Sequence, residues 1–425
     1  MVFPKVDIPA LKYFTIFIAL GELLHIMINT APPLSLRAVY IGIYLYFCFT
    51  QIRLIPLFTA MNLIMERFST VFGEFLPNTM IFHLIILLFG YVQMKNLRGI
   101  EMGYFNKRDF SLFILFAVYV FISATYYGDY NFFLRFLFSW LFFHYLLLSS
   151  DEYIIALANS IIFVMLLACL FSFYNYNNII SAYATSLGSA DRLAWKDSNY
   201  LSFFIGISFI LLYFKFVYSK DESEKKKYII ALFIFFVSLM MLISRGAILS
   251  LLMVLFLYNW KNFFSTKIIK YFLLILGVFL ISYEFGLLDG AIMRFMSDDM
   301  TTGSGRTKLW ATGLNTFFQK DYFTILFGTG EGNAANMIYL NGIYYSPHNN
   351  YLELLFNYGV IGLSLFLLSW FLLFVSSKTK EKRALILFFL INSMTIVPLT
   401  YVVPLWIIIP LLFMWDERIN YLLYE

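Results

Sequence analysis

The histidine at position 348 is the residue of this 425-residue chain best placed to do chemistry. It stands in the run SPHNNYLELLF, where Asn349 or Asn350 can cap a helix and Glu353 can complete a capping box. The partial positive charge at a helix N-terminus disfavours imidazolium, and a neutral imidazole suits a general base. We therefore predict that His348 is catalytic. The alternative is a turn histidine that only orders the loop.

Three arginines are the second set of candidates. Arg192 lies in SADRLAWKDSNY, Arg245 lies in SRGA, and Arg306 opens the run RTKLWATGLNTFF. A guanidinium is a permanent charge whose forked donors match phosphate oxygens, and helix N-termini add to such a site. We predict that the three bind a pyrophosphate, with Arg306 also acting in catalysis. The alternative is that each is an interfacial anchor whose charge reaches toward water.

Secondary candidates are Asn349, Glu331 and Arg135. Glu331 lies in the glycine-rich run GTGEG, and Arg135 lies near the end of a predicted span. The adjacent Asp298 and Asp299 could suggest a divalent metal, but neighbouring aspartates without further ligands are usually solvated. We expect no metal and no cofactor.

The composition indicates where these residues must sit. Charged residues make up 13% of the chain, hydrophobic residues 61% and aromatic residues 21%. A soluble enzyme would need many more surface charges, and disordered or nucleic-acid-binding chains need charge and few aromatics. The sequence therefore predicts an all-α, polytopic membrane protein, because only helices satisfy their backbone in lipid without closing a barrel.

The apolar runs predict about 12 transmembrane helices, each near 20 residues. The predicted spans are 11–29, 36–60, 79–94, 110–126, 132–148, 153–173, 199–218, 228–243, 246–259, 271–288, 351–377 and 384–414. Gln51 and Arg53 interrupt the second span, and three prolines make the last one either a kinked helix or two short helices. The histidines inside spans, His25, His83 and His144, are expected to be structural.

Basic residues assign the two faces of the membrane. More than half of the 30 lysines and arginines lie in four loops at 95–108, 215–227, 261–270 and 378–383, which the predicted spans place on one side. By the positive-inside rule this side is the cytoplasm. The three candidate arginines therefore break the trend, since they fall on the opposite face.

The longest segment between predicted spans is an extracytoplasmic loop at 289–350 within a single membrane domain at 1–425. Such long loops are usually functional. Within it, residues 304–318 place Leu309, Trp310, Leu314 and Phe317 at helical spacing, which predicts an amphipathic helix on the membrane or on the bundle.

These outer-face residues carry a family resemblance. Ser244-Arg245-Gly246, Arg306 with Trp310, Gly328-Thr329-Gly330 and His348-Asn349, in this order, resemble the O-antigen polymerase and O-antigen ligase superfamily of bacterial membranes (Wzy-type polymerases and WaaL-type ligases). The stretch 192–199 is similar to an earlier loop of that family. The resemblance covers residues from about 190 to 365.

The resemblance implies a GT-C-like glycosyltransferase in the bacterial cytoplasmic (inner) membrane. It implies inverting, metal-independent transfer from an undecaprenyl-pyrophosphate-linked oligosaccharide, with Arg192, Arg245 and Arg306 on the leaving group and His348 on the acceptor. Membrane lipid and a chain-length regulator are the further expected partners, and nucleic acid is not. A repeat-unit polymerase is favoured over a ligase that uses lipid A-core. A polytopic transporter or flippase is the alternative of another class.

Overall fold

The computed structural model describes most of the chain, and its described part is almost entirely helical. The residues described are 8–28, 34–68, 79–97, 107–147, 151–174, 198–242, 244–259, 277, 280, 283–284, 306–396 and 405–415. The fold class predicted from composition, an all-α protein, is confirmed. The predicted span 271–288 lies almost wholly outside the described residues.

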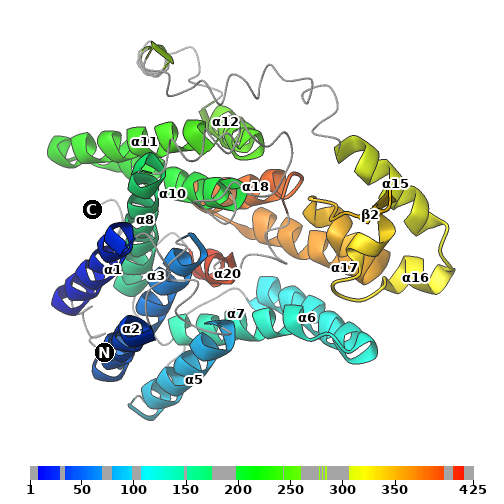
Figure 1. Ribbon diagram of the computed structural model, residues 1–425, viewed down its shortest axis with the longest axis horizontal. Coiled ribbons are helices and arrows are strands. Elements are labelled where there is room, and N and C mark those ends of the chain that lie inside the picture. Colours follow the sequence, from blue (N-terminus) through cyan, green and yellow to red (C-terminus); the bar gives the residue numbers. More distant parts are fainter. Residues whose placement is uncertain are drawn as a thin grey trace.

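The N-terminal half forms a group of apolar helices that also packs against helices of the C-terminal half (Figure 1). Its helices are α1 (Ile8–Ile28), α2 (Leu34–Thr50), α3 (Ile55–Phe68), α5 (Thr79–Leu97), α6 (Lys107–Tyr127), α7 (Asn131–Leu147) and α8 (Asp151–Tyr174). The ambiguous span 36–60 is two helices, α2 and α3, which are bent by 109° at a short 3-10 turn over Ile52–Leu54. The polar pair Gln51 and Arg53 marks this break.

The C-terminal half contributes a second group of helices beside the first (Figure 1). They are α10 (Ser198–Tyr218), α11 (Glu222–Leu242), α12 (Arg245–Asn259), α15 (Arg306–Phe318), α16 (Tyr322–Phe327), α17 (Asn350–Ser376), α18 (Lys380–Asn392) and α20 (Leu405–Met414). The predicted span 384–414 falls on the two helices α18 and α20, with Pro410 inside the second. The short-helix alternative is therefore the right one.

Three of the described helices are long and apolar enough to cross a membrane, and the bent pair α2–α3 allows a fourth. The three contain Tyr153–Leu170, Asn199–Tyr218 and Asn350–Ser376. Shorter apolar helices surround them, so twelve spans stays a prediction. One helix nevertheless has an exposed apolar face. Leu249, Leu252, Met253 and Phe256 are exposed along α12 at helical spacing. Such faces are typical of an integral membrane protein.

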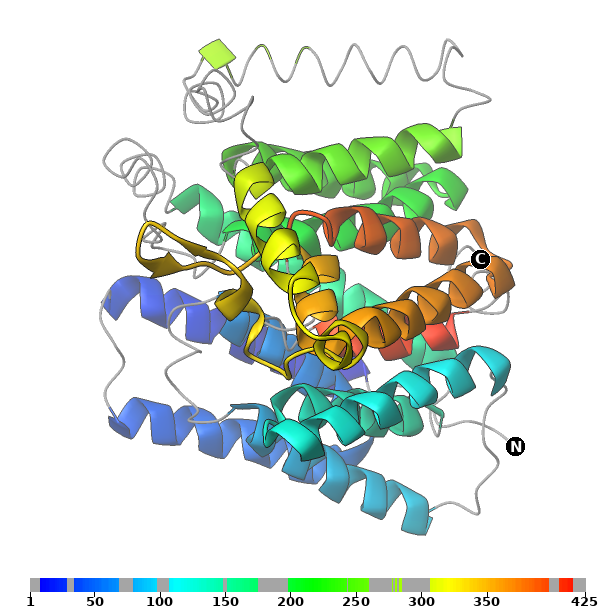
Figure 2. The ribbon, with the colours of Figure 1, turned by 90° about the vertical axis from the view of Figure 1, so that its right-hand side faces the viewer.

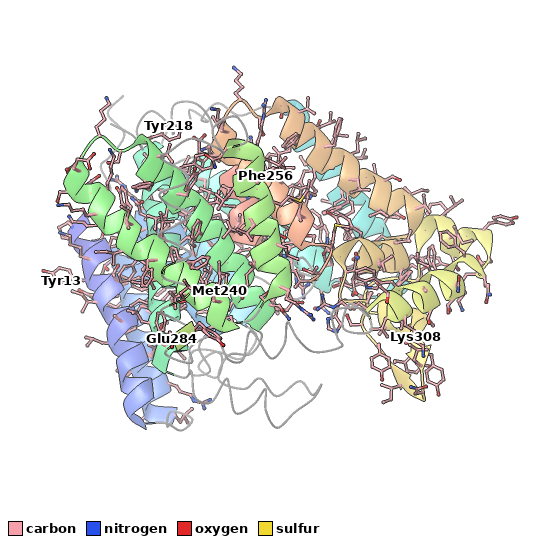
Figure 3. All side chains as sticks on the ribbon, turned by 90° about the horizontal axis from the view of Figure 1, so that it is seen from above. Tyr13, Tyr218, Met240, Phe256, Glu284 and Lys308 are labelled. Carbon is pink, nitrogen blue, oxygen red and sulfur yellow. The ribbon has the colours of Figure 1, made fainter. Side chains whose placement is uncertain are left out.

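The helices run between two ends of the molecule, as Figure 3 shows from above, with Tyr218 and Phe256 near one edge and Lys308 near the other. The first end is basic. There Tyr213 donates to Asn259 (2.8 Å), and Arg383 donates to the carbonyl of Ser377 (2.8 Å). Tyr218, the last residue of α10, also interacts with Glu381 in the loop at 378–383, so the loops at 215–227 and 378–383 share one end, as the distribution of lysines predicted.

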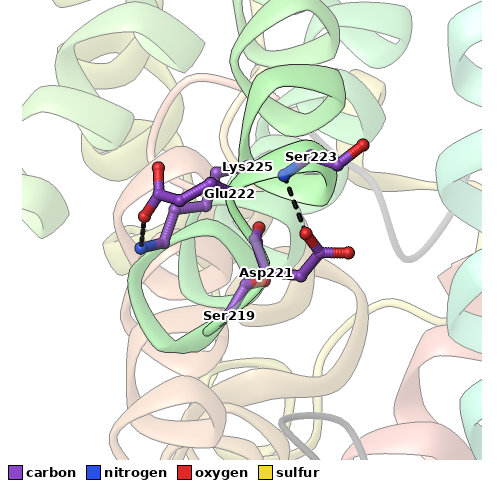
Figure 4. A network of polar contacts seen from close by, with 5 residues as sticks. All are labelled: Ser219, Asp221, Glu222, Ser223 and Lys225. Atoms are coloured by element: carbon purple, nitrogen blue, oxygen red, sulfur yellow. Dashed lines mark hydrogen bonds and ion pairs between the residues drawn. The ribbon is translucent and has the colours of Figure 1, made fainter.

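The turn that begins α11 at this basic end is capped by its own side chains (Figure 4). Asp221 accepts from the backbone N–H of Ser223 (2.8 Å), and Lys225 pairs with Glu222 (2.6 Å). Carboxylates in the first turn of a helix complement its dipole. Local side chains therefore contribute to the start of α11, and Lys226 and Lys227 are exposed there.

The opposite end carries the described part of the long loop. Helix α15, helix α16 and a two-stranded hairpin, β1 (Tyr339–Leu340) with β2 (Ile343–Tyr344), gather around the start of α17 (Figures 1 and 2). A separate apolar cluster holds them there, formed by Phe317, Ala334, Met337, Ile338, Leu355 and Phe356. Helix α15 lies within the segment 304–318; its Phe317 is buried in this cluster, while Phe318 remains largely exposed.

Helix α17 is broken one third of the way along. Gly359 has φ 67°, a value that L side chains rarely adopt, so the helix is two segments that meet at a kink. The loop residue Gly328, also at positive φ, packs directly on the backbone of Asn357 and Tyr358, where a Cβ would clash. The sequence predicted a span at 351–377 without this break.

Candidate functional site

The N-terminus of α17 is the centre of the candidate site. Asn349 is its N-cap, and the side-chain oxygen accepts from the backbone N–H groups of Tyr351 (3.0 Å) and Leu352 (3.2 Å). His348, directly before it, is exposed and has φ 48°. A non-glycine residue in this left-handed region is uncommon and is concentrated at functional sites. The predicted position of His348 before a capped helix is confirmed.

The capping box predicted for Glu353 is wrong. Because Asn349 is the cap, the third helical position is Leu352, and Glu353 lies one residue too far along. Its side chain is instead buried, where one oxygen accepts weakly from Asn357 (3.5 Å). Glu353 therefore points into the bundle rather than back at the cap.

Helix α15 reaches the same place through its tryptophan. The indole N–H of Trp310 donates to the carbonyl of Pro347 (2.8 Å), the residue before His348. Arg306 is the first residue of α15 and lies one turn before Trp310, so both occupy the same helix face. This contact brings the Arg306 end of α15 to the start of α17.

The Ser-Arg-Gly turn meets α17 through a short turn that follows α18. Gly246 packs so closely on the side chain of Thr395 that a Cβ would clash. Two residues earlier, the carbonyl of Ser393 accepts from the backbone N–H of Asn350 (2.8 Å). The turn at 392–395 therefore lies between Gly246 and Asn350, and Arg245 starts α12 at the same end as His348.

Asn199, at the start of α10, also lies at this end, because its side chain accepts from the hydroxyl of Ser244 (3.3 Å). Arg192 lies outside the described residues, as does most of its loop. Its part in the anion site therefore stays a prediction. The structure brings together the segments that carry Arg245, Arg306 and His348.

The glycine-rich loop places Glu331 against another helix start. Thr329 and Gly330 donate backbone N–H groups to the carbonyls of Phe356 and Asn357 (both 2.9 Å), at the kink of α17. Held in this way, Glu331 is buried and its carboxylate accepts from the backbone N–H of Phe132 (2.5 Å) at the start of α7. It therefore caps α7 from outside that helix.

Burial raises the pKa of Glu331 to about 7, although the Phe132 N–H and the charge of Arg135 work in the opposite direction. Arg135 thus lies near Glu331, one turn inside α7, and whether it also touches the anion site stays a prediction. A carboxyl that titrates near neutrality at a helix start is a second titratable group at this end of the bundle.

Sequence reasoning missed a set of buried polar side chains beside His348. We call this set the polar stripe: Asn350, Glu353 and Asn357 of α17, with Asn392 and Ser393 at the end of α18. The first three are spaced i, i+3 and i+7, so they share one helix face. The sequence NNYLELLFN contains this spacing. It was missed because polar residues at the start of an apolar span also occur where a loop ends and the span begins.

The other histidines behave as predicted where their side chains are described. His83 is fully buried and hydrogen-bonded to Tyr44 (3.1 Å) and Asn62 (3.2 Å), and His144 bonds to the carbonyl of Trp140 (2.9 Å). The side chain of His25, together with Asp298 and Asp299, lies outside the described residues. Within the described residues, no three His, Cys, Asp or Glu side chains group as metal ligands.

Comparison with known families adds an independent finding. A family model described as O-antigen ligase (Wzy_C) matches residues 230–367, and no curated protein matches the chain. The matched part contains Arg245, Arg306 and His348, whose segments meet at the start of α17, and Glu331, which lies at the start of α7. The family is one of glycosyl-transferring enzymes of bacterial membranes, in keeping with the apolar helix faces. Over residues 230–367 this match supports the resemblance to the O-antigen polymerase and ligase superfamily.

Proposed function

We propose that this protein polymerises undecaprenyl-pyrophosphate-linked oligosaccharide repeat units into O-antigen or capsular polysaccharide at the outer face of the bacterial inner membrane. One observation carries the proposal: the Arg245 turn, the Arg306 helix and His348 converge on the N-terminus of α17. They do so at the end opposite the lysine-rich loops, where topology gives no reason for arginine.

The proposed step is an inverting displacement. An acceptor sugar hydroxyl attacks the anomeric carbon of the donor, the carbon–oxygen bond to the lipid pyrophosphate breaks, and the pyrophosphate leaves with the bonding electrons. The acceptor proton passes to a ring nitrogen of His348. Arg192, Arg245 and Arg306 neutralise the charge that grows on the leaving group, with Arg306 reaching it from the first turn of α15.

The residue types support this division of labour. Pyrophosphate is already a good leaving group, so positive charge and one base are sufficient, and no metal is required in the proposal. His348 lies at the surface, directly before a capped helix start. The exposed position leaves room for an acceptor glycan to approach.

A ligase that transfers finished glycan to lipid A-core is the second candidate, and the description of the matching family favours it. Both reactions use the same donor chemistry and differ only in the acceptor. Glycan profiling of a deletion strain separates them. Lipid-anchored single repeats would support a polymerase, polymer left on undecaprenol would support a ligase, and unaltered glycan would contradict both.

A further inference from the structure

The polar stripe leads from the surface into the bundle. It begins at Asn350, two residues after the exposed His348, and continues along one face of the first segment of α17 to Asn357. Asn392 and Ser393 face it from the end of α18, since the carbonyl of Ser393 accepts from the Asn350 backbone. The stripe ends just before the break at Gly359.

Most polar atoms of these buried side chains have no hydrogen-bond partner. Neither the amide nitrogen nor the amide oxygen of Asn350 or Asn392 has a partner, and the same holds for one oxygen of Glu353, the oxygen of Asn357 and the hydroxyl of Ser393. None of the five side chains is more than 3% exposed. Buried polar groups are nearly always paired, because an orphaned one costs stability. A concentration of them in one place indicates a partner that is not part of the chain.

The chemistry of the stripe selects the class of that partner. Carboxamides and a hydroxyl offer both donors and acceptors, and the stripe contains one carboxyl and no lysine or arginine. A phosphate would need cations or an excess of donors, so it suits the arginines and not the stripe. A neutral ring with several hydroxyl groups matches a set of mixed donors and acceptors.

We propose that the polar stripe is a subsite for a sugar ring of the lipid-linked glycan, whose hydroxyls pair with Asn350, Asn357 and Asn392. The inference rests on the proposed function and deepens it. The arginines hold the charged end of the substrate, and the stripe holds a neutral sugar a few residues farther along α17. The anomeric carbon then lies between them, next to His348.

The test replaces stripe amides by apolar side chains of similar size. In Asn357→Leu and Asn392→Leu, buried orphaned groups are removed, so the melting temperature of the purified protein should stay level or rise. The KM for lipid-linked glycan extracted from a deletion strain should rise tenfold or more. Binding of undecaprenyl pyrophosphate without a sugar should stay within twofold of wild type.

A matched pair of serines controls for folding. Ser393 and Ser208 are both fully buried with orphaned hydroxyls, but Ser208 lies within α10, away from the stripe. Ser393→Ala should raise the KM, and Ser208→Ala should not. This pair keeps the test valid if either leucine variant fails to fold.

The outcomes are separable. An unchanged KM in all stripe variants would mean that internal water or nothing satisfies these groups, and the subsite would be wrong. Equal loss of both probes would also overturn it, because a sugar subsite must discriminate between them. If wild-type protein neither binds nor converts the lipid-linked glycan, the proposed function itself fails.

Discussion

Two buried polar clusters lie in this membrane bundle, and they differ in how their hydrogen bonds are satisfied. In the N-terminal half, His83 bonds to Tyr44 and Asn62 through its two ring nitrogens, while Tyr40 donates to Asn62 (2.5 Å) and Tyr44 contacts Thr59 (3.3 Å). In the C-terminal half, the polar stripe is equally buried, but most of its polar atoms have no partner.

This difference in hydrogen bonding separates a cluster that stabilises the fold from one that is available to a ligand. A network in which each of these side chains has a partner rigidifies α2, α3 and α5. An unpaired cluster lowers stability in the free protein, which is tolerable where a substrate supplies the missing bonds. Both clusters are buried and polar, and both contain asparagine, so hydrogen-bond satisfaction is the criterion that distinguishes them.

The largest expected effect comes from exchanging the two histidines for alanine. His348→Ala removes the proposed base and should reduce glycan polymerisation by about 10²- to 10⁴-fold without lowering the protein level. His83→Ala should instead destabilise the protein, by about 1–3 kcal/mol for the hydrogen-bond partners it leaves unpaired. Glycan chain length and melting temperature measure the two losses. Normal chain length in His348→Ala would exclude its role as the base.

The next effect tests the contact between the break of α17, next to the stripe, and the loop at 326–328. Gly359 and Gly342 both have positive φ, but a Cβ on Gly359 would meet the backbone of Leu326, while Gly342 faces open space. Gly342→Ala should cost about 1–2 kcal/mol from the conformation alone. Gly359→Ala should cost a further amount of about 1–3 kcal/mol from overpacking. Equal melting temperatures for the two variants would show that the contact with the loop is unimportant.

Arg306→Lys keeps the positive charge but removes the forked guanidinium donors. It tests whether the arginines proposed to bind pyrophosphate beside the stripe have a function that the neutral N-terminal cluster lacks. Loss of one charge-assisted hydrogen bond, worth about 1.5–3 kcal/mol, should lower kcat/KM roughly 10- to 100-fold. Lys308→Arg, on the exposed side of the same helix turn, is the control and should leave the rate unchanged. Full activity of Arg306→Lys would favour simple anchoring.

Much of this fold follows from the sequence alone. The apolar runs are long, so they predict helices well. The ends of the predicted spans 153–173 and 199–218 lie within about two residues of the ends of α8 and α10, which is the usual uncertainty of helix ends. The position of Arg245, Arg306 and His348 at the end opposite the lysine-rich loops also follows from the distribution of basic residues. The convergence of these three segments did not follow, since it depends on the Trp310–Pro347 bond and on the turn at 392–395.

The remaining differences have physical causes. Glu353 looked like a capping residue because the cap could be either of two asparagines, and a shift of one residue turns its side chain inward. The break at Gly359 was hidden because glycine is also tolerated within apolar helices, and only the close approach of the loop at 326–328 shows why it is needed. Tertiary contacts decided both points.

The smallest expected effect is a pH dependence that separates Glu331 from ordinary surface carboxyls. The pKa of Glu331 is raised from 4.5 to about 7, so the folded protein binds this proton more tightly than the unfolded chain does. The contribution of this raised pKa to the free energy of unfolding is complete below pH 4.5, the pKa in the unfolded chain. It is lost as the pH rises through 7, and it amounts to at most about 3 kcal/mol. The melting temperature should therefore fall between about pH 5 and pH 8.

Glu331→Gln keeps an acceptor for the Phe132 N–H and should flatten that slope, because the neutral amide does not titrate. The control is Asp321→Asn. The backbone N–H and hydroxyl of Thr324 hold the pKa of the exposed Asp321 below its ordinary value, so its stabilisation is lost only as the pH falls through that lowered pKa. An unchanged slope in Glu331→Gln would mean that Glu331 stays ionised when buried, with Arg135 as its counter-charge. In that case Arg135 would be bound to the loop and would be unable to serve the pyrophosphate site.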